Sequence, residues 1–220
     1  MKKNLIKSFA LACGLLASMG VNAQNVAATK DGRVVGEKFT ALGVEYEVTA
    51  VETPTCKIVG VASGATEITV ASNNILPDDA KLDVFVLEGG LNNQFATAED
   101  LEEITAVDPT PMTIPADAFA AVVYQTAYLT IPDGSCRKYA KATGWKNFLG
   151  KQTASGDIMG DLDGDEAVTL NDVAIMKNLA DDGIEDGDDE YDELYDLDGD
   201  GFITLNDVAI AKNIADEGLF

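Results

Sequence analysis

The sequence predicts a β-rich N-terminal domain followed by a small all-α module. Residues 157–220 hold 21 Asp and Glu against two Lys, a net charge of −19, whereas residues 24–156 hold 17 acids and ten bases, a net charge of −7. The C-terminal part also contains a repeat, because residues 161–179 and 196–214 are identical at 14 of 19 aligned positions. Upstream of it, short alternations of apolar and polar residues between Gly, Pro and Asn turns indicate strands.

The first 23 residues are typical of a bacterial secretory signal peptide. Three lysines precede a largely apolar run, and Val21-Asn22-Ala23 forms a small-residue cleavage site. A lipid anchor at Cys13 is the less favoured alternative, because Lys7 interrupts the apolar run before it. No later stretch approaches the roughly 20 apolar residues that span a bilayer. We therefore expect no membrane span and a secreted or cell-surface location.

The predicted organisation has five segments. They are a signal peptide (1–23), a lead-in (24–38), a β-rich repeat-like domain (39–150), a linker (151–156) and an acidic module (157–220). The acidic module would repel phosphate, so nucleic acid is not an expected partner. A disordered acidic tail is the alternative, but apolar residues recur in both copies at helical spacing, which such a tail lacks.

The N-terminal domain contains four runs with strand character. They lie at 44–51, 56–62, 66–72 and 81–89, and one helix is predicted at 135–142. Cys56 and Cys136 remain in the mature chain. They form either a disulfide that closes a long loop or two separate buried thiols, and the sequence leaves both alternatives open.

Each acidic repeat has the spacing of an EF-hand calcium loop. Such loops supply ligands from positions 1, 3, 5, 7, 9 and 12, and position 7 uses its backbone carbonyl. Hard oxygen ligands in this number favour Ca²⁺ over Zn²⁺, so two Ca²⁺ ions are predicted. The predicted ligands are Asp161, Asp163, Asp165, Ala167, Thr169 and Asp172 in loop 1, and Asp196, Asp198, Asp200, Phe202, Thr204 and Asp207 in loop 2.

The two loops differ at position 6. Loop 2 has Gly201, which accepts the left-handed backbone expected there, whereas loop 1 has Glu166. A side chain in that conformation costs on the order of 1 kcal/mol. We therefore expect loop 2 to bind calcium more tightly.

The C-terminal module resembles a type I dockerin. The resemblance rests on two acidic loops about 35 residues apart, each followed directly by a helix with Lys at a fixed offset, and it covers residues 157–220. It implies two Ca²⁺ ions, two loop-helix units about a pseudo-two-fold axis, and a cohesin-type partner domain. The partner-binding residues that it implies are Leu170, Asn171, Lys177, Leu205, Asn206 and Lys212.

The similarity of the two copies outside their acidic residues predicts two equivalent docking faces. A half-turn would then present the same residues, so one partner could bind in either orientation. Recent duplication without selection on the surface is the alternative. The segment between the copies is predicted to be an acidic connector whose Ile184, Tyr191, Leu194 and Tyr195 touch the helices.

The segment 111–148 resembles the closing stretch of BspA-type leucine-rich-repeat proteins of bacterial surfaces. The matching residues are Ile114, Pro115, Ala118, Phe119, Leu129, Ile131, Pro132, Gly134, Ser135, Tyr139, Gly144, Trp145 and Phe148. The resemblance implies a shortened, degenerate repeat domain with one or two coils and a cap, in which Trp145 is a packing residue. It also suggests a surface polysaccharide or a host protein as ligand.

The chain contains no His, which removes the usual base of serine and cysteine proteases and most zinc enzymes. A glycosidase needs only two carboxylates, and the candidates are Glu45, Glu47, Asp83, Glu88, Glu102 and Glu103. Because acidic residues on strands are more often solvated, we expect a non-catalytic adaptor with no catalytic residues. A small polysaccharide-active enzyme recruited by its dockerin is the alternative.

Overall fold

The computed structural model describes residues 34–50, 55–70 and 86–219. The predicted signal peptide and most of the lead-in lie outside these residues, as does residue 83. Of the strand expected at 81–89, the described part forms β5 (Val86–Leu87). No helix in the described part of the chain is long and apolar enough to cross a membrane.

The first sheet contains β1 (Lys38–Ala41), β2 (Val44–Ala50), β3 (Thr55–Val61) and β5 in that order. β1, β2 and β3 are antiparallel neighbours, and β5 runs parallel to β3. Between β1 and β2, Leu42 and Gly43 have φ values of 51° and 76°. Two successive positive values are what a two-residue type I′ hairpin turn requires.

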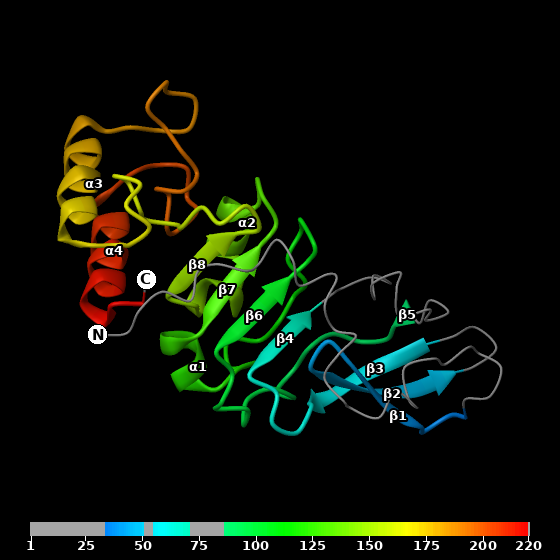
Figure 1. The fold of residues 1–220 in the computed structure, drawn as a ribbon. Coiled ribbons are helices and arrows are strands. Elements are labelled where there is room, and N and C mark those ends of the chain that lie inside the picture. The colour runs from blue at the N-terminus through cyan, green and yellow to red at the C-terminus, as the bar shows by residue number, and fades with distance from the viewer. Residues whose placement is uncertain (1–33, 51–54, 71–85, 220) are drawn as a thin grey trace.

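The second sheet is parallel throughout and follows chain order (Figure 1). It contains β4 (Glu67–Val70), β6 (Glu103–Ala106), β7 (Tyr128–Ile131) and β8 (Gly150–Thr153). β6, β7 and β8 begin at residues 103, 128 and 150, which gives steps of 25 and 22 residues. The sequence pattern located β4, which lies within the alternating run at 66–72, but not the other three, because four-residue strands outside such a longer run show no clear alternation.

Three short helices lie in the connections of the second sheet. They are α1 (Ala121–Thr126), α2 (Cys136–Lys141) and the 3₁₀ helix η3 (Trp145–Asn147). The predicted helix at 135–142 corresponds to α2. The expectation of a single helix in this domain was wrong, since α1 also forms, and its six residues with two adjacent Val give little helical signal.

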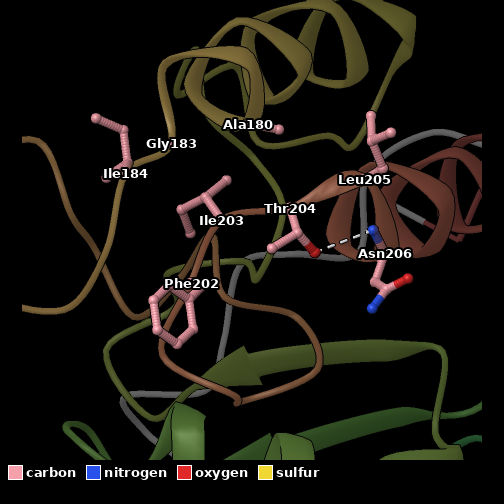
Figure 2. Close-up of a pocket in the computed structure, with 8 residues that line it drawn as sticks. All are labelled: Ala180, Gly183, Ile184, Phe202, Ile203, Thr204, Leu205 and Asn206. Carbon is pink, nitrogen blue, oxygen red and sulfur yellow. Dashed lines mark hydrogen bonds between the residues drawn. The ribbon is translucent and has the colours of Figure 1, made fainter.

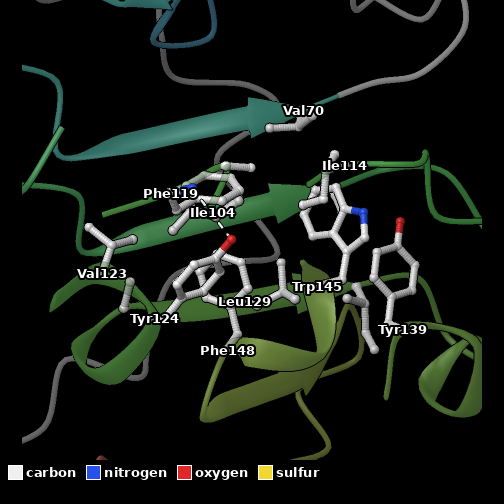
Figure 3. Close-up of a cluster of buried hydrophobic side chains, with 14 of the residues drawn as sticks. Val70, Ile104, Ile114, Phe119, Val123, Tyr124, Leu129, Tyr139, Trp145 and Phe148 are labelled. Atoms are coloured by element: carbon white, nitrogen blue, oxygen red, sulfur yellow. Dashed lines mark hydrogen bonds between the residues drawn. The ribbon is translucent and has the colours of Figure 1, made fainter. Parts of the chain in front are cut away.

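An aromatic cluster fills the space between the second sheet and these connections (Figure 3). Phe119 contacts Tyr124, Trp145 and Phe148 with ring centroids 5.8, 6.1 and 5.0 Å away. Trp145 is 1 % exposed, and its indole N–H donates to the carbonyl of Met112 at 2.8 Å. Trp145 is therefore a core residue, as the cap pattern predicted, and it offers no surface for stacking on sugar.

The two cysteines are not bonded to each other. Cys56 lies in β3 of the first sheet and Cys136 in α2, and both are free and buried. Burial raises the pKa of the Cys56 thiol to about 11 and that of Cys136 to about 12. Of the two open alternatives, the structure selects separate buried thiols, because the residues belong to different layers of the fold.

The C-terminal module consists of two acidic loops and two helices, α3 (Leu170–Asp182) and α4 (Leu205–Glu217), which contact each other. Its helices lie beside β8, at the end of the molecule away from the first sheet (Figure 1). The first half of the linker expected at 151–156 lies in β8, because residues 150–153 pair with β7. Met159 N–H also donates to the carbonyl of Lys151 at 3.0 Å, so the module follows the sheet directly.

Replacement of Trp145 with Ala should lower the free energy of unfolding by about 3–5 kcal/mol, because the cavity would lie inside the aromatic cluster. Val122 on α1 is 44 % exposed, so Val122→Ala is the control and should change stability by less than about 0.5 kcal/mol. Urea denaturation followed by circular dichroism measures both. Equal effects of the two substitutions would contradict the assignment of Trp145 to the core.

Candidate calcium-binding loops

Loop 1 brings its four predicted carboxylates together. One oxygen from each of Asp161, Asp163, Asp165 and Asp172 lies within 4.8 Å of the others. Because like charges at this separation repel, the cluster favours an ion between them. Burial, followed by the charges of Asp172, Asp165 and Asp161, raises the pKa of Asp163.

Loop 2 brings three of its four predicted carboxylates together. Oxygens of Asp196, Asp198 and Asp207 lie within 4.8 Å of one another, and Asp200 is outside this group. Burial raises the pKa of Asp198 and of Asp207. A raised pKa means that the ionised carboxylate is less stable in the folded loop than in water, which a bound cation would reverse.

The Asp at position 12 joins each loop to its helix. Asp172 Oδ1 accepts from the backbone N–H of Leu162 and of Asp163, while Oδ2 accepts from the backbone N–H and hydroxyl of Thr169. Asp207 makes the same four contacts in loop 2, with Leu197, Asp198 and Thr204. Each Asp is thus the third residue of its helix and closes a capping box with the Thr at position 9.

The remaining predicted ligands have roles that the loops also share. Thr169 and Thr204 are the N-cap residues of α3 and α4, and their side chains accept from the backbone N–H of Asn171 and Asn206. At position 7, the backbone N–H of Ala167 donates to Asp165 Oδ1 at 3.1 Å, and that of Phe202 donates to Asp200 Oδ1 at 2.9 Å. The repeated sequence therefore produces repeated local geometry.

Position 6 has a left-handed backbone in both loops, as the sequence predicted. Glu166 has φ of 67° and Gly201 has φ of 97°. Only the residue in loop 1 carries a side chain into this conformation, at a cost of about 1–2 kcal/mol. That loop 2 binds calcium more tightly remains a prediction.

Asp196, at position 1 of loop 2, supplies an independent indication of a cation. The residue is fully buried, and its Oδ2 accepts from the hydroxyl of Tyr191 at 2.7 Å and from Gly201 N–H at 2.9 Å. Its Oδ1 is buried and has no hydrogen-bond partner among the described residues. A buried carboxylate oxygen without a partner is costly. A bound Ca²⁺ would satisfy it, so the residues of the loop fit this ion.

The predicted partner-binding residues lie on the surface of the module. Leu170 is 67 % exposed and Leu205 is 65 % exposed, at the first position of α3 and of α4. The residues that follow them, Asn171 and Asn206, are also exposed. Lys177 pairs with Asp181 at 2.5 Å, and Lys212 pairs with Asp216. The two sets are therefore matched in exposure as well as in sequence.

Beside Phe202 and Leu205 the surface forms a shallow pocket of about 420 Å³ (Figure 2). It is lined by Ala180, Gly183, Ile184, Phe202, Ile203, Thr204, Leu205 and Asn206. Phe202 is 46 % exposed, and its counterpart in loop 1 is the much smaller Ala167. Sequence reasoning assigned Phe202 a backbone role only, and the exposed ring adds an apolar element to one of the two faces.

Three residues that contact loop 2 were missed as functional residues. Arg137 and Asp186 form an ion pair at 2.5 Å, and the Arg137 guanidinium lies 3.7 Å from Asp196 Oδ2. Tyr191 was predicted to touch the helices, and its hydroxyl donates a hydrogen bond to Asp196 Oδ2. The only sequence signal for these contacts is the difference between Gly201 and Glu166 at position 6.

The comparison with protein-family models matches residues 159–214 to the dockerin type I domain. This confirms the resemblance of the C-terminal module, which is a type I dockerin domain and implies calcium binding and a cohesin partner. No curated protein and no solved structure matches the chain. The resemblance of the N-terminal domain to leucine-rich-repeat proteins gains no support from these comparisons, and the structure shows two small sheets instead of a full solenoid.

Replacing Glu166 with Gly should tighten calcium binding by loop 1 about fivefold, because it removes roughly 1 kcal/mol of backbone strain. Glu166→Ala is the matched control, since it removes the same carboxylate but keeps a Cβ at positive φ. Calorimetric titration of the full chain with Ca²⁺ measures both variants. Equal tightening by Ala and Gly would show that the charge of Glu166, and not its backbone, limits loop 1.

Proposed function

We propose that the protein is an exported, calcium-dependent adaptor. Its dockerin domain docks onto a cohesin-type partner, and its N-terminal domain recognises a surface polysaccharide or a host protein without catalysis. The observation that carries this proposal is the pair of acidic loops, each of which leads through a capping box into a helix with an exposed Leu-Asn pair and Lys. Within the part of the chain that the structure describes, both sets of docking residues are exposed.

Calcium is the switch in this proposal. The module has a net charge of −19 between residues 157 and 220, and only a small set of apolar residues to bury. Two Ca²⁺ ions would place four positive charges where the carboxylates converge, so their binding free energy becomes folding free energy. Extracellular calcium suffices for loops with dissociation constants of about 10⁻⁴ to 10⁻³ M.

The two equivalent faces support docking in two orientations. The N-caps Thr169 and Thr204 have φ of −126° and −130°, and both helices end at a left-handed Gly, Gly183 and Gly218. Matched helices with matched exposed residues can present the same surface after a half-turn. Duplication without selection on the surface would produce the same similarity, and binding experiments separate the two explanations.

The N-terminal domain is proposed to be a shortened repeat structure with a recognition role. Its last three parallel strands lie side by side in chain order, with steps of 25 and 22 residues. Steps of 20–29 residues with one strand each are typical of leucine-rich repeats. The aromatic cluster behind these strands then acts as the cap that closes the short array.

One observation favours the alternative of a polysaccharide-active enzyme. Glu67 and Glu103 are neighbours on β4 and β6, and burial together with the charge of Glu67 raises the pKa of Glu103. A glycosidase requires such a pair of unlike carboxyl groups. Incubation of the chain with a panel of polysaccharides decides between the functions, because an adaptor releases no reducing ends. Release that Glu103→Gln abolishes would establish the enzyme.

Chelation of calcium should unfold the dockerin domain and leave the N-terminal domain folded. Far-ultraviolet circular dichroism of the full chain should lose the part of its helical signal that comes from α3 and α4 in EDTA, and should regain it with excess Ca²⁺. The single tryptophan, Trp145, lies in the N-terminal core and reports on that domain, so its emission should not change. A helical signal that persists in EDTA would mean that the loops do not need calcium to fold.

Leu170→Asp and Leu205→Asp should each weaken cohesin binding only about twofold, because the other face stays available. The double substitution should abolish binding, since an acid replaces the apolar centre of both faces. Calorimetry with a cohesin domain in excess Ca²⁺ measures the series, and Val122→Asp, at an exposed apolar position of α1 in the N-terminal domain, is the control. Loss of binding from one single substitution would restrict docking to one face.

A further inference from the structure

Loop 2 of the dockerin domain lies against α2 of the N-terminal domain. Arg137 of α2 contacts two backbone carbonyls of the loop, those at positions 4 and 5. We propose that α2 forms the outer wall of calcium site 2, with Arg137 as a positioning residue, so that calcium at this site and docking of the two domains are linked. The proposal rests on the proposed function, in which the loops bind calcium.

Arg137 holds the backbone of the loop at several points. Its Nε donates to the carbonyl of Gly199 at 3.3 Å, and its Nη2 donates to the carbonyl of Asp200 at 3.4 Å. Its Nη1 donates to Asp186 Oδ2 at 2.5 Å. The planar guanidinium therefore fixes loop 2 and the connector together, a geometry that the single amine of Lys cannot reproduce.

The contacts of Asp196 indicate how Arg137 could orient this carboxylate for metal binding. Its Oδ2 faces Arg137 Nε at 3.7 Å and accepts from Tyr191 and Gly201. Its Oδ1 is left without a partner among the described residues. Partners that satisfy the outer oxygen of a ligating carboxylate orient its inner oxygen toward the ion. Arg137 and Tyr191 thus prepare Asp196 as a ligand.

Two glycines of loop 2 lie at the contact with α2. A Cβ at Gly199 would lie 2.6 Å from the carbonyl oxygen of Arg137 and 3.2 Å from the Cβ of Ala140. A Cβ at Gly201 would collide with Arg137 Nη2. A side chain at position 201 would therefore displace the end of the Arg137 side chain, whereas the collision at position 199 is with the backbone of α2.

Among the described residues, no element covers loop 1 in the way that α2 covers loop 2. A Cβ at Gly164, the counterpart of Gly199, would meet nothing within 4 Å. Asp161, the counterpart of Asp196, uses both oxygens within its own loop, accepting from the N–H of Gly164 at 2.7 Å and of Glu166 at 2.9 Å. The exposed Glu166 occupies the position that Arg137 covers in loop 2. The N-terminal domain thus distinguishes two loops that are nearly identical in sequence.

The positive charge of Arg137 opposes a nearby cation, but two contacts limit this effect. The guanidinium is paired with Asp186, whose charge offsets it, and it lies on the side of Asp196 away from the unpartnered oxygen. Positioning of Asp196 and of the loop backbone is then the larger effect. Linkage makes this effect reciprocal. If docking of α2 through Arg137 strengthens calcium binding at site 2, calcium binding strengthens the docking of the two domains by the same free energy.

Calorimetric titration with Ca²⁺ tests the proposal in the full chain, one site at a time. Asp163→Asn silences loop 1 so that site 2 is measured, and Asp198→Asn silences loop 2 so that site 1 is measured. Arg137→Ala should weaken site 2 about tenfold, which is the usual effect of removing a partner of a metal ligand, and should leave site 1 within twofold. Arg137→Lys should fall between Ala and the unchanged chain.

Gly199→Ala and Gly164→Ala form a matched pair, because the two glycines occupy position 4 with φ of 77° and 76°. Both substitutions carry the same backbone strain, but only the methyl group added at position 199 would collide with α2. Each substitution should lower the calcium affinity of its own site. The loss at site 2 from Gly199→Ala should exceed the loss at site 1 from Gly164→Ala by at least about fivefold. Equal effects would overturn the proposal, and Trp145 emission confirms that the N-terminal domain of each variant is folded.

Hydrogen exchange measures the reciprocal effect. Calcium should slow exchange of the peptide spanning 136–142 in the unchanged chain but not in Arg137→Ala. Unchanged exchange in the first case, or tighter calcium binding after Arg137→Ala, would overturn the proposal. A chain in which neither loop binds calcium would contradict the proposed function, whereas two binding loops that are both insensitive to Arg137→Ala would contradict only the role of α2.

Discussion

Repulsion among the loop carboxylates is the constraint on which the C-terminal module depends. Oxygens of three or four Asp lie within 4.8 Å of one another in each loop, and one Asp of each group lies in the first turn of the helix that follows. Asp172 and Asp207 belong to the carboxylate clusters and also close the capping boxes of the helices, so the loop and the helix cannot form independently. A cation that joins the carboxylates would thus stabilise both the site and the docking surface.

The N-terminal domain packs directly against this module. A parallel sheet with an aromatic cluster behind it continues through β8 into the first loop, and α2 packs against the second loop. The two domains therefore share backbone hydrogen bonds and an arginine contact. An adaptor built in this way would hold its recognition surface and its docking surface in a fixed relation.

The two copies in the dockerin domain agree in their local structure but differ in the contacts that other parts of the chain make with them. Caps, helix lengths and the exposure of Leu170 and Leu205 agree between the copies. Among the described residues, the contacts of Arg137 and Tyr191 and the exposed ring of Phe202 occur at the second copy and not at the first. The local sequence determines the shared features and also those of Tyr191 and Phe202, whereas the position of the N-terminal domain determines the contact of Arg137.

The sequence by itself determined the two carboxylate clusters, the two helices with their caps, and the strained position of Glu166, because each depends on residues within a dozen positions of one another. The parallel pairing of β6, β7 and β8 was decided only by the tertiary structure, since strands of four residues have no period of their own. The same holds for the separate burial of Cys56 and Cys136. The Arg137 contact joins residues 62 positions apart, and no local pattern encodes a contact whose partners meet only after both domains have folded.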